Sequence, residues 1–255
     1  MRKNTFKQAI TEGRQQIGIW HMTRDTQLTE MLGGCGFDWL LIDCEHTPNS
    51  EADVLAKLQA LNGSPTTPAV RPTCLDVAEI KRLLDVGAQT FVVPYVQTVE
   101  EAKLAAAAVD YPPNGIRGVA GGSRSSRYGT IPGYFETARD EICLIVQVET
   151  VAAIERLEEI AAVPGIDGLF IGPSDLAASM GHPGNPGHPD VLDAILSAMR
   201  RIRAAGKPAG FLSANQEMLD QVVDAGCVFT AIDIDLGLLQ RSAMQRLEVC
   251  KRWKD

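Results

Sequence analysis

Two acidic residues, Glu149 and Asp175, carry the most readily interpreted chemistry in this sequence of 255 residues. Glu149 directly follows the apolar run 142–148, and Asp175 follows the apolar run 168–171 after a Gly-Pro-Ser segment. At the carboxyl ends of neighbouring parallel strands, these carboxylates would repel each other unless a positive charge lay between them. A divalent cation supplies that charge, and carboxylates with water and substrate oxygens suit hard ions such as Mg²⁺ or Mn²⁺.

The residues alone leave two other roles open for this pair. The carboxylates could form an acid/base couple, as in a glycosidase. Each could instead cap the helix that follows it, and Asp175 precedes a Leu-Ala-Ala segment that suits a helix.

His46 and Arg71 also follow apolar runs and are therefore candidates for the same site. His46 lies close to Asp43 and Glu45 in the sequence, and an imidazole with an ordinary pKa of about 6.5 can act as a general base. A structural hydrogen bond is the alternative role for this histidine. Arg71 could bind a carboxylate or a developing oxyanion, or could form a structural ion pair.

The other histidines and the lysines offer less. His21 follows the first apolar run and could line the pocket, whereas His182 and His188 are expected on the surface, in a Gly- and Pro-rich loop over 180–189. No lysine falls at the carboxyl end of a predicted strand, so Schiff-base chemistry is not expected. Carbonyl chemistry in this pocket would therefore need a metal as electron sink.

Eight short apolar runs must position these side chains. They are rich in Val, Ile and Phe and do not alternate with polar residues, which is typical of parallel strands buried on both faces. Helical patterns lie between most of them, at 51–61, 77–85, 99–109, 151–162, 189–205 and 216–225, and most of these patterns end at Gly or Pro. The runs are 17–20, 38–42, 68–71, 90–94, 142–148, 168–171, 209–212 and 229–232.

With roughly 32 residues for each strand–helix unit, this pattern predicts an α/β fold, a single (β/α)8 TIM barrel over residues 1–255. An open doubly wound sheet is the alternative, but its G-x-G-x-x-G fingerprint is absent after the first run. The long irregular segment 111–141 is expected after the fourth strand, at the end where barrels keep their active sites, as a lid or an oligomer contact.

Composition excludes several classes of protein. The formal net charge of −8 argues against nucleic-acid partners. No apolar run is long enough to cross a bilayer, and no apolar region of a signal peptide follows the first residues. The six cysteines lack C-x-x-C spacing and are expected to be reduced thiols. These features predict a cytoplasmic protein.

Four segments in order resemble motifs of the HpcH/HpaI class II pyruvate aldolases, which include 4-hydroxy-2-oxoheptanedioate aldolase and 2-keto-3-deoxy-L-rhamnonate aldolase. The segments span nearly the whole chain, and their order makes the resemblance specific. They are FDWLLIDCEHTPN at 37–49, YPPNGIRG at 111–118, QVE at 147–149 and GLFIGPSDL at 168–176.

The resemblance implies a TIM barrel in which Glu149 and Asp175 hold Mg²⁺, Mn²⁺ or Co²⁺. It implies that Gln147, Ser174 and Asp175 bind the pyruvyl group of the substrate. This chain departs from the family at Cys44, where glycine is common, and at His21 and Asp233. These departures leave the pyruvyl site intact but could alter the part of the pocket that receives the aldehyde.

The resemblance also implies that His46 is the general base, that Arg71 stabilises the enolate-like transition state and that Asp85 raises the basicity of His46. Asp85 ends the helix before the fourth strand, so we expect it to reach His46 of a neighbouring subunit. A homohexamer, a trimer of dimers with exchanged C-terminal helices, is implied as well. The sequence itself predicts only a helix over 238–253 with one apolar face.

The function predicted in this way is reversible cleavage of a 4-hydroxy-2-oxo acid into pyruvate, or a close 2-oxo acid, and an aldehyde. An oxaloacetate decarboxylase or a related metal-enolate lyase is the main alternative. A lyase of CoA thioesters and a barrel that binds without catalysis are more distant alternatives.

Overall fold

Eight parallel strands close into a barrel in the computed structural model, which describes residues 2–253. Each strand pairs with the next in chain order, and the last pairs with the first. The strands are β1 (Gln16–His21), β2 (Trp39–Asp43), β3 (Thr67–Arg71), β4 (Thr90–Val93), β5 (Cys143–Val148), β6 (Gly168–Ile171), β7 (Ala209–Leu212) and β8 (Cys227–Ile234). The prediction of a (β/α)8 barrel is confirmed, and the open sheet is excluded.

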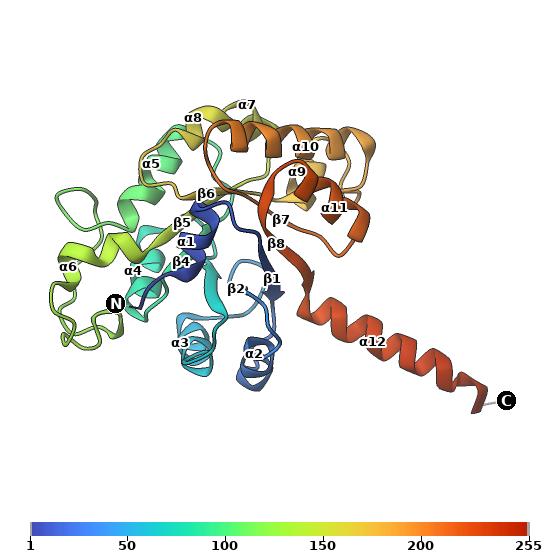
Figure 1. Ribbon diagram of the computed structural model, residues 1–255, viewed down its shortest axis with the longest axis horizontal. Coiled ribbons are helices and arrows are strands. Elements are labelled where there is room, and N and C mark those ends of the chain that lie inside the picture. Colours follow the sequence, from blue (N-terminus) through green and yellow to red (C-terminus); the bar gives the residue numbers. More distant parts are fainter. Residues whose placement is uncertain (1, 254–255) are drawn as a thin grey trace.

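Helices surround the barrel (Figure 1). Side chains cap most of their N-termini, and Ser50 and Thr98 each form a capping box with the acidic residue three positions later. The helices are α1 (Thr5–Thr11), α2 (Thr26–Gly33), α3 (Glu51–Ala60), α4 (Val77–Asp85), α5 (Val99–Ala108), α6 (Tyr134–Thr137), α7 (Val151–Glu155), α8 (Leu157–Ala161), α9 (Pro173–Ser179), α10 (Pro189–Ala204), α11 (Gln216–Asp224) and α12 (Asp235–Cys250), with short 3₁₀ turns at Arg124–Ser126, Ala138–Glu141 and Lys251–Trp253.

Alternation along the strands separates the barrel interior from the layer between barrel and helices. On β2, Trp39 and Leu41 belong to the interior cluster, whereas Leu40 and Ile42 pack with the helices. Phe6 of α1 packs against the ring of Trp39, with ring centroids 5.5 Å apart, and so covers the amino-terminal end of the barrel. The carboxyl-terminal end is therefore the end available for a site.

The segment 111–141 does not lie where we expected it. It connects α5 to β5, so it leaves a helix rather than a strand and lies at the amino-terminal end of the barrel. The prediction that it lies at the active-site end is wrong, because the helix 99–108 had already carried the chain back across the barrel. A lid over the carboxyl-terminal end of its own barrel is thus excluded.

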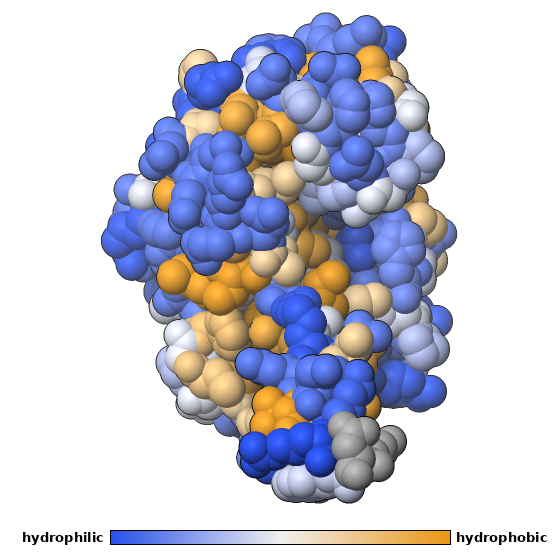
Figure 2. Space-filling model, turned by 90° about the vertical axis from the view of Figure 1, so that its right-hand side faces the viewer, coloured by the Kyte–Doolittle hydropathy of each residue, from blue (hydrophilic) through white to orange (hydrophobic). Residues whose placement is uncertain are grey.

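The last helix, α12, leaves the barrel as a projecting arm (Figure 1). It begins three residues before the predicted start, and Asp235 is its only buried residue. Figure 2 shows this side of the molecule, where apolar and polar side chains are interspersed. The exposed apolar residues of this arm and of the 3₁₀ turn that follows it are Leu236, Leu238, Leu239, Met244, Leu247, Val249 and Trp253. Among residues 2–253, no helix combines the length and apolar character needed to cross a membrane.

Candidate active site

Glu149, directly after β5, is held rigidly at the carboxyl end of the barrel. Its side chain is buried, and its Oε1 accepts a hydrogen bond of 2.8 Å from the backbone N–H of Tyr95. Tyr95 adopts a left-handed backbone conformation, with φ of 57°, in the turn after β4. The side-chain amide of Gln147 donates to the other oxygen, Oε2. Two donors, one in the turn after β4 and one on β5, therefore fix the orientation of this carboxylate.

Gly172, which follows β6, makes room for that carboxylate. A Cβ at this position would lie 2.1 Å from Glu149 Oε2 and 2.7 Å from Gln147 Nε2. The backbone angles of Gly172, φ of −84° and ψ of 104°, are available to any residue. The glycine is therefore required by the close approach of Glu149 and not by its own conformation.

Three carboxylates gather at this end of the barrel. Burial raises the pKa of Glu149 to about 7, and the negative charges of Asp175 and Glu45 add to that rise. Burial also raises the pKa of Glu45, although Arg71 opposes the change. Glu149 and Glu45 thus occupy places where ionisation is unfavourable without a neighbouring cation.

Neither carboxylate of the predicted pair is an N-cap, so that alternative is wrong. Thr150 caps α7, and Gly172 occupies the N-cap position of α9 without a side-chain hydrogen bond. Asp175 lies in the first turn of α9, where the helix dipole favours a negative charge. The neighbouring Ser174 is exposed.

The donor atoms fit a hard divalent cation. The Oε1 atom of Gln147 is buried and has no hydrogen-bond partner within residues 2–253. With the carboxylates of Glu149 and Asp175, this amide oxygen forms a set of oxygen donors of the kind that Mg²⁺ and Mn²⁺ prefer.

Arg71, at the end of β3, is the most constrained cation near these carboxylates. Its Nε and Nη2 each donate to the carboxylate of Asp43 at 2.8 Å, and its Nη1 lies 2.7 Å from Glu45. The guanidinium also lies over the ring of Trp20, 4.8 Å from its centroid. The ion pair that was the alternative role for Arg71 exists, and it fixes a planar donor at the carboxyl end of the barrel. The roles of Asp43 and Trp20 were not predicted.

His46 lies in the loop after β2 and is open to solvent, with 59% of its side chain exposed. Its Nε2 is 3.7 Å from Glu45, and no shorter contact to a carboxylate is present among residues 2–253. An exposed imidazole beside the carboxylate cluster can accept a proton from a bound molecule.

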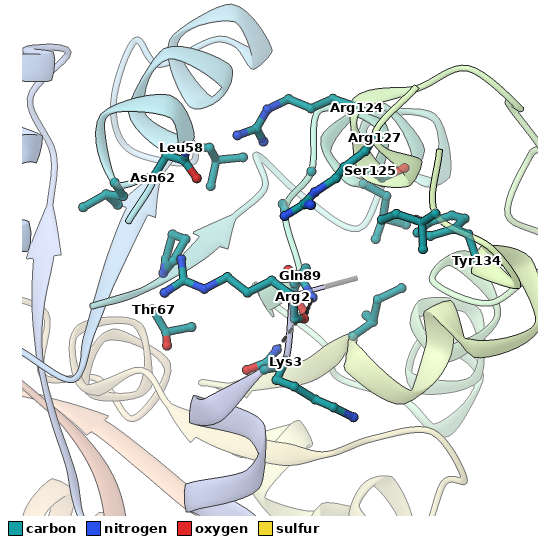
Figure 3. A pocket seen from close by; sticks show the side chains of 18 of the residues that line it. Arg2, Lys3, Leu58, Asn62, Thr67, Gln89, Arg124, Ser125, Arg127 and Tyr134 are labelled. Atoms are coloured by element: carbon teal, nitrogen blue, oxygen red, sulfur yellow. Dashed lines mark hydrogen bonds between the residues drawn. The ribbon is translucent and has the colours of Figure 1, made fainter. Parts of the chain in front are cut away.

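Asp85 lies at the other end of the barrel, because it ends α4 just before β4 begins. Its carboxylate is 3.4 Å from Nη2 of the buried Arg117. Next to this pair is a cavity of about 370 Å³, and Figure 3 shows that Arg124 and Arg127 approach it from the segment 111–141. Asp85 therefore does not contact His46 of its own chain.

His21 does not line the pocket, and that expectation is wrong. Strand alternation places Trp20 in the barrel interior and His21 on the outer side, where it is fully buried. His21 Nδ1 lies 2.7 Å from Asp235, and Nε2 lies 2.7 Å from Thr29. Burial raises the pKa of Asp235, but hydrogen bonds from His21 and Met22 outweigh it and lower the pKa overall. The role of His21 is to join α12 to β1 and α2.

Two other departures from the family pattern are also accounted for within the chain. Asp233 pairs with Arg241 of α12, and Cys44 is buried on the helix side of the barrel.

His182 and His188 stack, with ring centroids 3.6 Å apart, and lie near Asp190. His188 Nδ1 accepts a hydrogen bond from the backbone of Asp190 and caps α10. The parallel rings and this capping bond account for the cluster structurally.

The chain is similar to known proteins over nearly its whole length. Residues 16–242 match the family model described as HpcH/HpaI aldolase/citrate lyase. A hydroxypyruvate/pyruvate aldolase of Sagittula stellata is 50% identical over 244 residues, which cover 96% of each chain. A 4-hydroxy-2-oxo-heptane-1,7-dioate aldolase of Klebsiella pneumoniae is 49% identical, with 94% of this chain and 91% of the relative covered.

A solved structure gives the same result for the fold. The crystal structure of an HpcH/HpaI aldolase/citrate lyase family protein from Burkholderia cenocepacia superimposes with a TM-score of 0.94 at 35% identity, covering 98% of this chain and all of the other. The chain belongs to the HpcH/HpaI aldolase/citrate lyase family.

Proposed function

We propose that this chain is a class II aldolase that reversibly cleaves 4-hydroxy-2-oxo acids into pyruvate, or a close 2-oxo acid, and an aldehyde. The observation that carries the proposal is the arrangement at the carboxyl end of the barrel. Buried Glu149 faces Gln147, with Asp175 nearby, and the fixed guanidinium of Arg71 lies at the same end. The names of the relatives support the same class of reaction.

Glu149 and Asp175 would hold a divalent cation, Mg²⁺, Mn²⁺ or Co²⁺. When bound, this cation supplies Lewis-acid polarisation of the 2-oxo group and neutralises the negative charge around it. The unpartnered oxygen of Gln147 and the raised pKa of Glu149 support a cation at this position.

Other side chains of this chain would bind the substrate, remove its proton and stabilise the enolate. Gln147 and Ser174, with Asp175, bind the pyruvyl part of the substrate. His46 removes the proton from the 4-hydroxyl group, and the bond between carbons 3 and 4 then breaks to release an aldehyde. The electron pair passes into the enolate of the 2-oxo acid, whose oxygen gains charge that Arg71 stabilises. Protonation of carbon 3 yields pyruvate.

Asp85 can assist His46 only from another chain, because the two lie at opposite ends of the barrel. The cavity beside Asp85 is lined by five cationic residues and by no Asp or Glu among residues 2–253. The carboxyl end of the barrel is rich in carboxylates, so the two ends are complementary in charge. We therefore expect the basic end of one subunit to face the acidic end of a neighbour. The five cations are Arg2, Lys3, Arg117, Arg124 and Arg127.

The arm α12 supports the same assembly, a homohexamer built as a trimer of dimers in which this helix is exchanged. Its apolar side chains are exposed in the single chain, as expected of a helix that packs on another subunit. The six cysteines are free thiols, which is consistent with a cytoplasmic location. We expect residues 1–255 to act as a single barrel domain in this assembly.

A pyruvate-release assay tests the proposal. The panel contains 4-hydroxy-2-oxo acids of different lengths and oxaloacetate, each with Mg²⁺, Mn²⁺ or a chelator. Release of pyruvate with an equal amount of aldehyde, lost after chelation, is expected. Pyruvate from oxaloacetate alone, without aldehyde from any hydroxy acid, would indicate a decarboxylase instead. Full activity after exhaustive chelation would contradict the class II assignment.

Complementation tests the role of Asp85. His46→Gln and Asp85→Asn chains are each expected to be weakly active alone. Mixed oligomers made from both should regain activity, because some sites combine an intact His46 with an intact Asp85 from the neighbour. Mixing that restores nothing would contradict a shared site.

A further inference from the structure

Lys57, in the last turn of α3, is a charged residue in an unusual place. Its side chain is fully buried, and no ion pair within 4 Å among residues 2–253 includes it. Burial lowers its pKa to about 8, although the surrounding carboxylates oppose the shift. An apolar side chain of similar length would fill this space without the cost of burying an ammonium group. The specific contribution of this lysine must therefore come from its hydrogen bonds.

The ammonium of Lys57 joins two loops at the carboxyl end of the barrel. It donates to Oδ1 of Asn49 at 2.8 Å, and Asn49 lies in the loop between β2 and α3. It also donates to the backbone carbonyl of Thr23, in the loop between β1 and α2. The first of these loops carries His46.

Asn49 connects Lys57 to the turn that contains His46. Its side-chain amide donates to the carbonyl oxygen of Asp43 at 2.7 Å and to Oγ1 of Thr47 at 2.8 Å. Thr47 donates to the same carbonyl of Asp43. Hydrogen bonds therefore close residues 43–49 into a turn. Lys57 holds this turn from outside by its hydrogen bond to Asn49.

The second loop is held on both sides. The backbone N–H groups of Met22 and Thr23 donate to Asp235 at 3.1 and 3.3 Å, while the carbonyl of Thr23 accepts from Lys57. This loop directly follows the end of β1, where Trp20 lies against the guanidinium of Arg71. Through its two acceptors, Lys57 thus links the loop of His46 to the strand end that supports Arg71.

We propose that Lys57 is a positioning residue of the active site, whose ammonium sets the place of His46 relative to Arg71 and Glu149 by anchoring Asn49 and Thr23. This proposal rests on the proposed aldolase function for its effect on catalysis. Lys57 does not itself react, because its side chain is inaccessible and both acceptors already engage its ammonium. A Schiff base at this amine is therefore excluded.

The test compares Lys57→Met with Lys103→Met, the same substitution on an exposed position of the barrel helix α5. Lys57→Met should lower kcat about tenfold or more, because misplacement of a catalytic group by ~1 Å can cost about 10²-fold. The KM for the 2-oxo acid and the affinity for Mn²⁺ should change by less than about threefold, because Lys57 does not contact Gln147, Glu149 or Arg71. Lys103→Met should match the wild type. A folded Lys57→Met enzyme with the kcat of the wild type would overturn the proposal.

A double-mutant cycle distinguishes positioning from general destabilisation. If Lys57 acts through Asn49, then Asn49→Ala should lower kcat by a similar factor, and the double variant should lose little more than either single variant. Fully additive losses would contradict the connection. If Lys57→Met does not fold, Asn49→Ala alone decides, and an unchanged kcat in that variant overturns the proposal.

Hydrogen exchange supplies a readout that does not depend on activity. In Lys57→Met, amides of the peptide 43–50 should exchange about tenfold faster or more, whereas the peptide 168–176 should be unchanged. Unchanged exchange in 43–50 would refute the positioning role even if the wild type cleaved none of the substrates in the panel. Inactivity of the wild type with the expected change in exchange would instead refute only the aldolase assignment.

Discussion

The substitution Gly172→Ala tests how closely the carboxylate of Glu149 is fitted to the barrel. The added Cβ would lie 2.1 Å from Glu149 Oε2 and 2.7 Å from Gln147 Nε2, whereas ordinary contacts begin at 3.4 Å. Because alanine tolerates the backbone angles of this position, the whole effect must come from displacement of these two side chains. The carboxylate would have to move by on the order of 1 Å.

A shift of that size has a calculable consequence. Misplacement by ~1 Å costs about 10²-fold in rate, which corresponds to about 2.7 kcal/mol of transition-state stabilisation. Overpacking of a buried site also lowers the free energy of unfolding by ~1–3 kcal/mol. We therefore expect Gly172→Ala to fold, to bind Mn²⁺ more weakly and to lose about two orders of magnitude in kcat/KM.

The assay combines Mn²⁺ titration with measurement of pyruvate release. Gly187→Ala is the matched control, because the nearest atom to its added Cβ is 4.0 Å away. That variant should behave as the wild type, with a change in unfolding free energy within about 0.5 kcal/mol. A Gly172→Ala enzyme with the metal affinity and kcat/KM of the wild type would refute the argument that this glycine positions Glu149.

Three further predictions concern Arg71, Glu149 and α12. Arg71→Ala should lower kcat by about 10²-fold or more, the scale of losing one oxyanion donor, and steady-state kinetics with unchanged kcat would reject its role. Because the pKa of Glu149 is raised from 4.5 to about 7, the metal-free folded chain holds its proton where the unfolded chain has lost it. The stability of the metal-free protein should therefore fall as pH rises through this window, and Mn²⁺ affinity should fall about tenfold per pH unit below 7. Calorimetry of Glu149→Gln, which cannot titrate, should show no such stability change. If the chain assembles as proposed, Leu239→Glu with Leu247→Glu should reduce the mass of the assembly in light scattering while the barrel still folds, because both side chains are exposed on α12; a mass equal to that of the wild type would exclude this arm from the interface.

Much of the fold followed from hydrophobic pattern, because strands buried on both faces have few other compositions. The apolar runs located the strands, and their number predicted a closed barrel. The helices α1, α2 and α6 were not predicted, since each is short and lacks a long apolar repeat. The segment 111–141 was placed at the wrong end because its composition indicates a loop but carries no information about direction.

The site could be predicted only as far as residue type and strand ends allow. Glu149 and Arg71 were chosen as candidates because Glu149 directly follows β5 and Arg71 ends β3. Gly172, Tyr95 and Lys57 were not found, since each acts through a contact with a residue distant in the sequence. His21 was assigned to the wrong face of β1. Successive residues of a strand point to opposite faces, so an error of one position reverses the face that a side chain occupies.

The charge of the site bears on how the proposed aldolase, an acidic protein, would bind an anionic oxo acid. Arg71 is engaged by Asp43 and Glu45, so its positive charge is largely balanced within the chain. Ionised Glu149 and Asp175 then leave the carboxyl end of the barrel negative, and a 2-oxo acid would be repelled from it. In the proposed aldolase, the same burial that raises the pKa of Glu149 would couple cation binding to loss of a proton. Binding of the cation and of the anionic substrate would then be coupled as well, and by linkage each would increase the affinity for the other. The cation would in this sense be as necessary for substrate binding as for the chemistry, a conclusion that the net charge of −8 alone would not suggest.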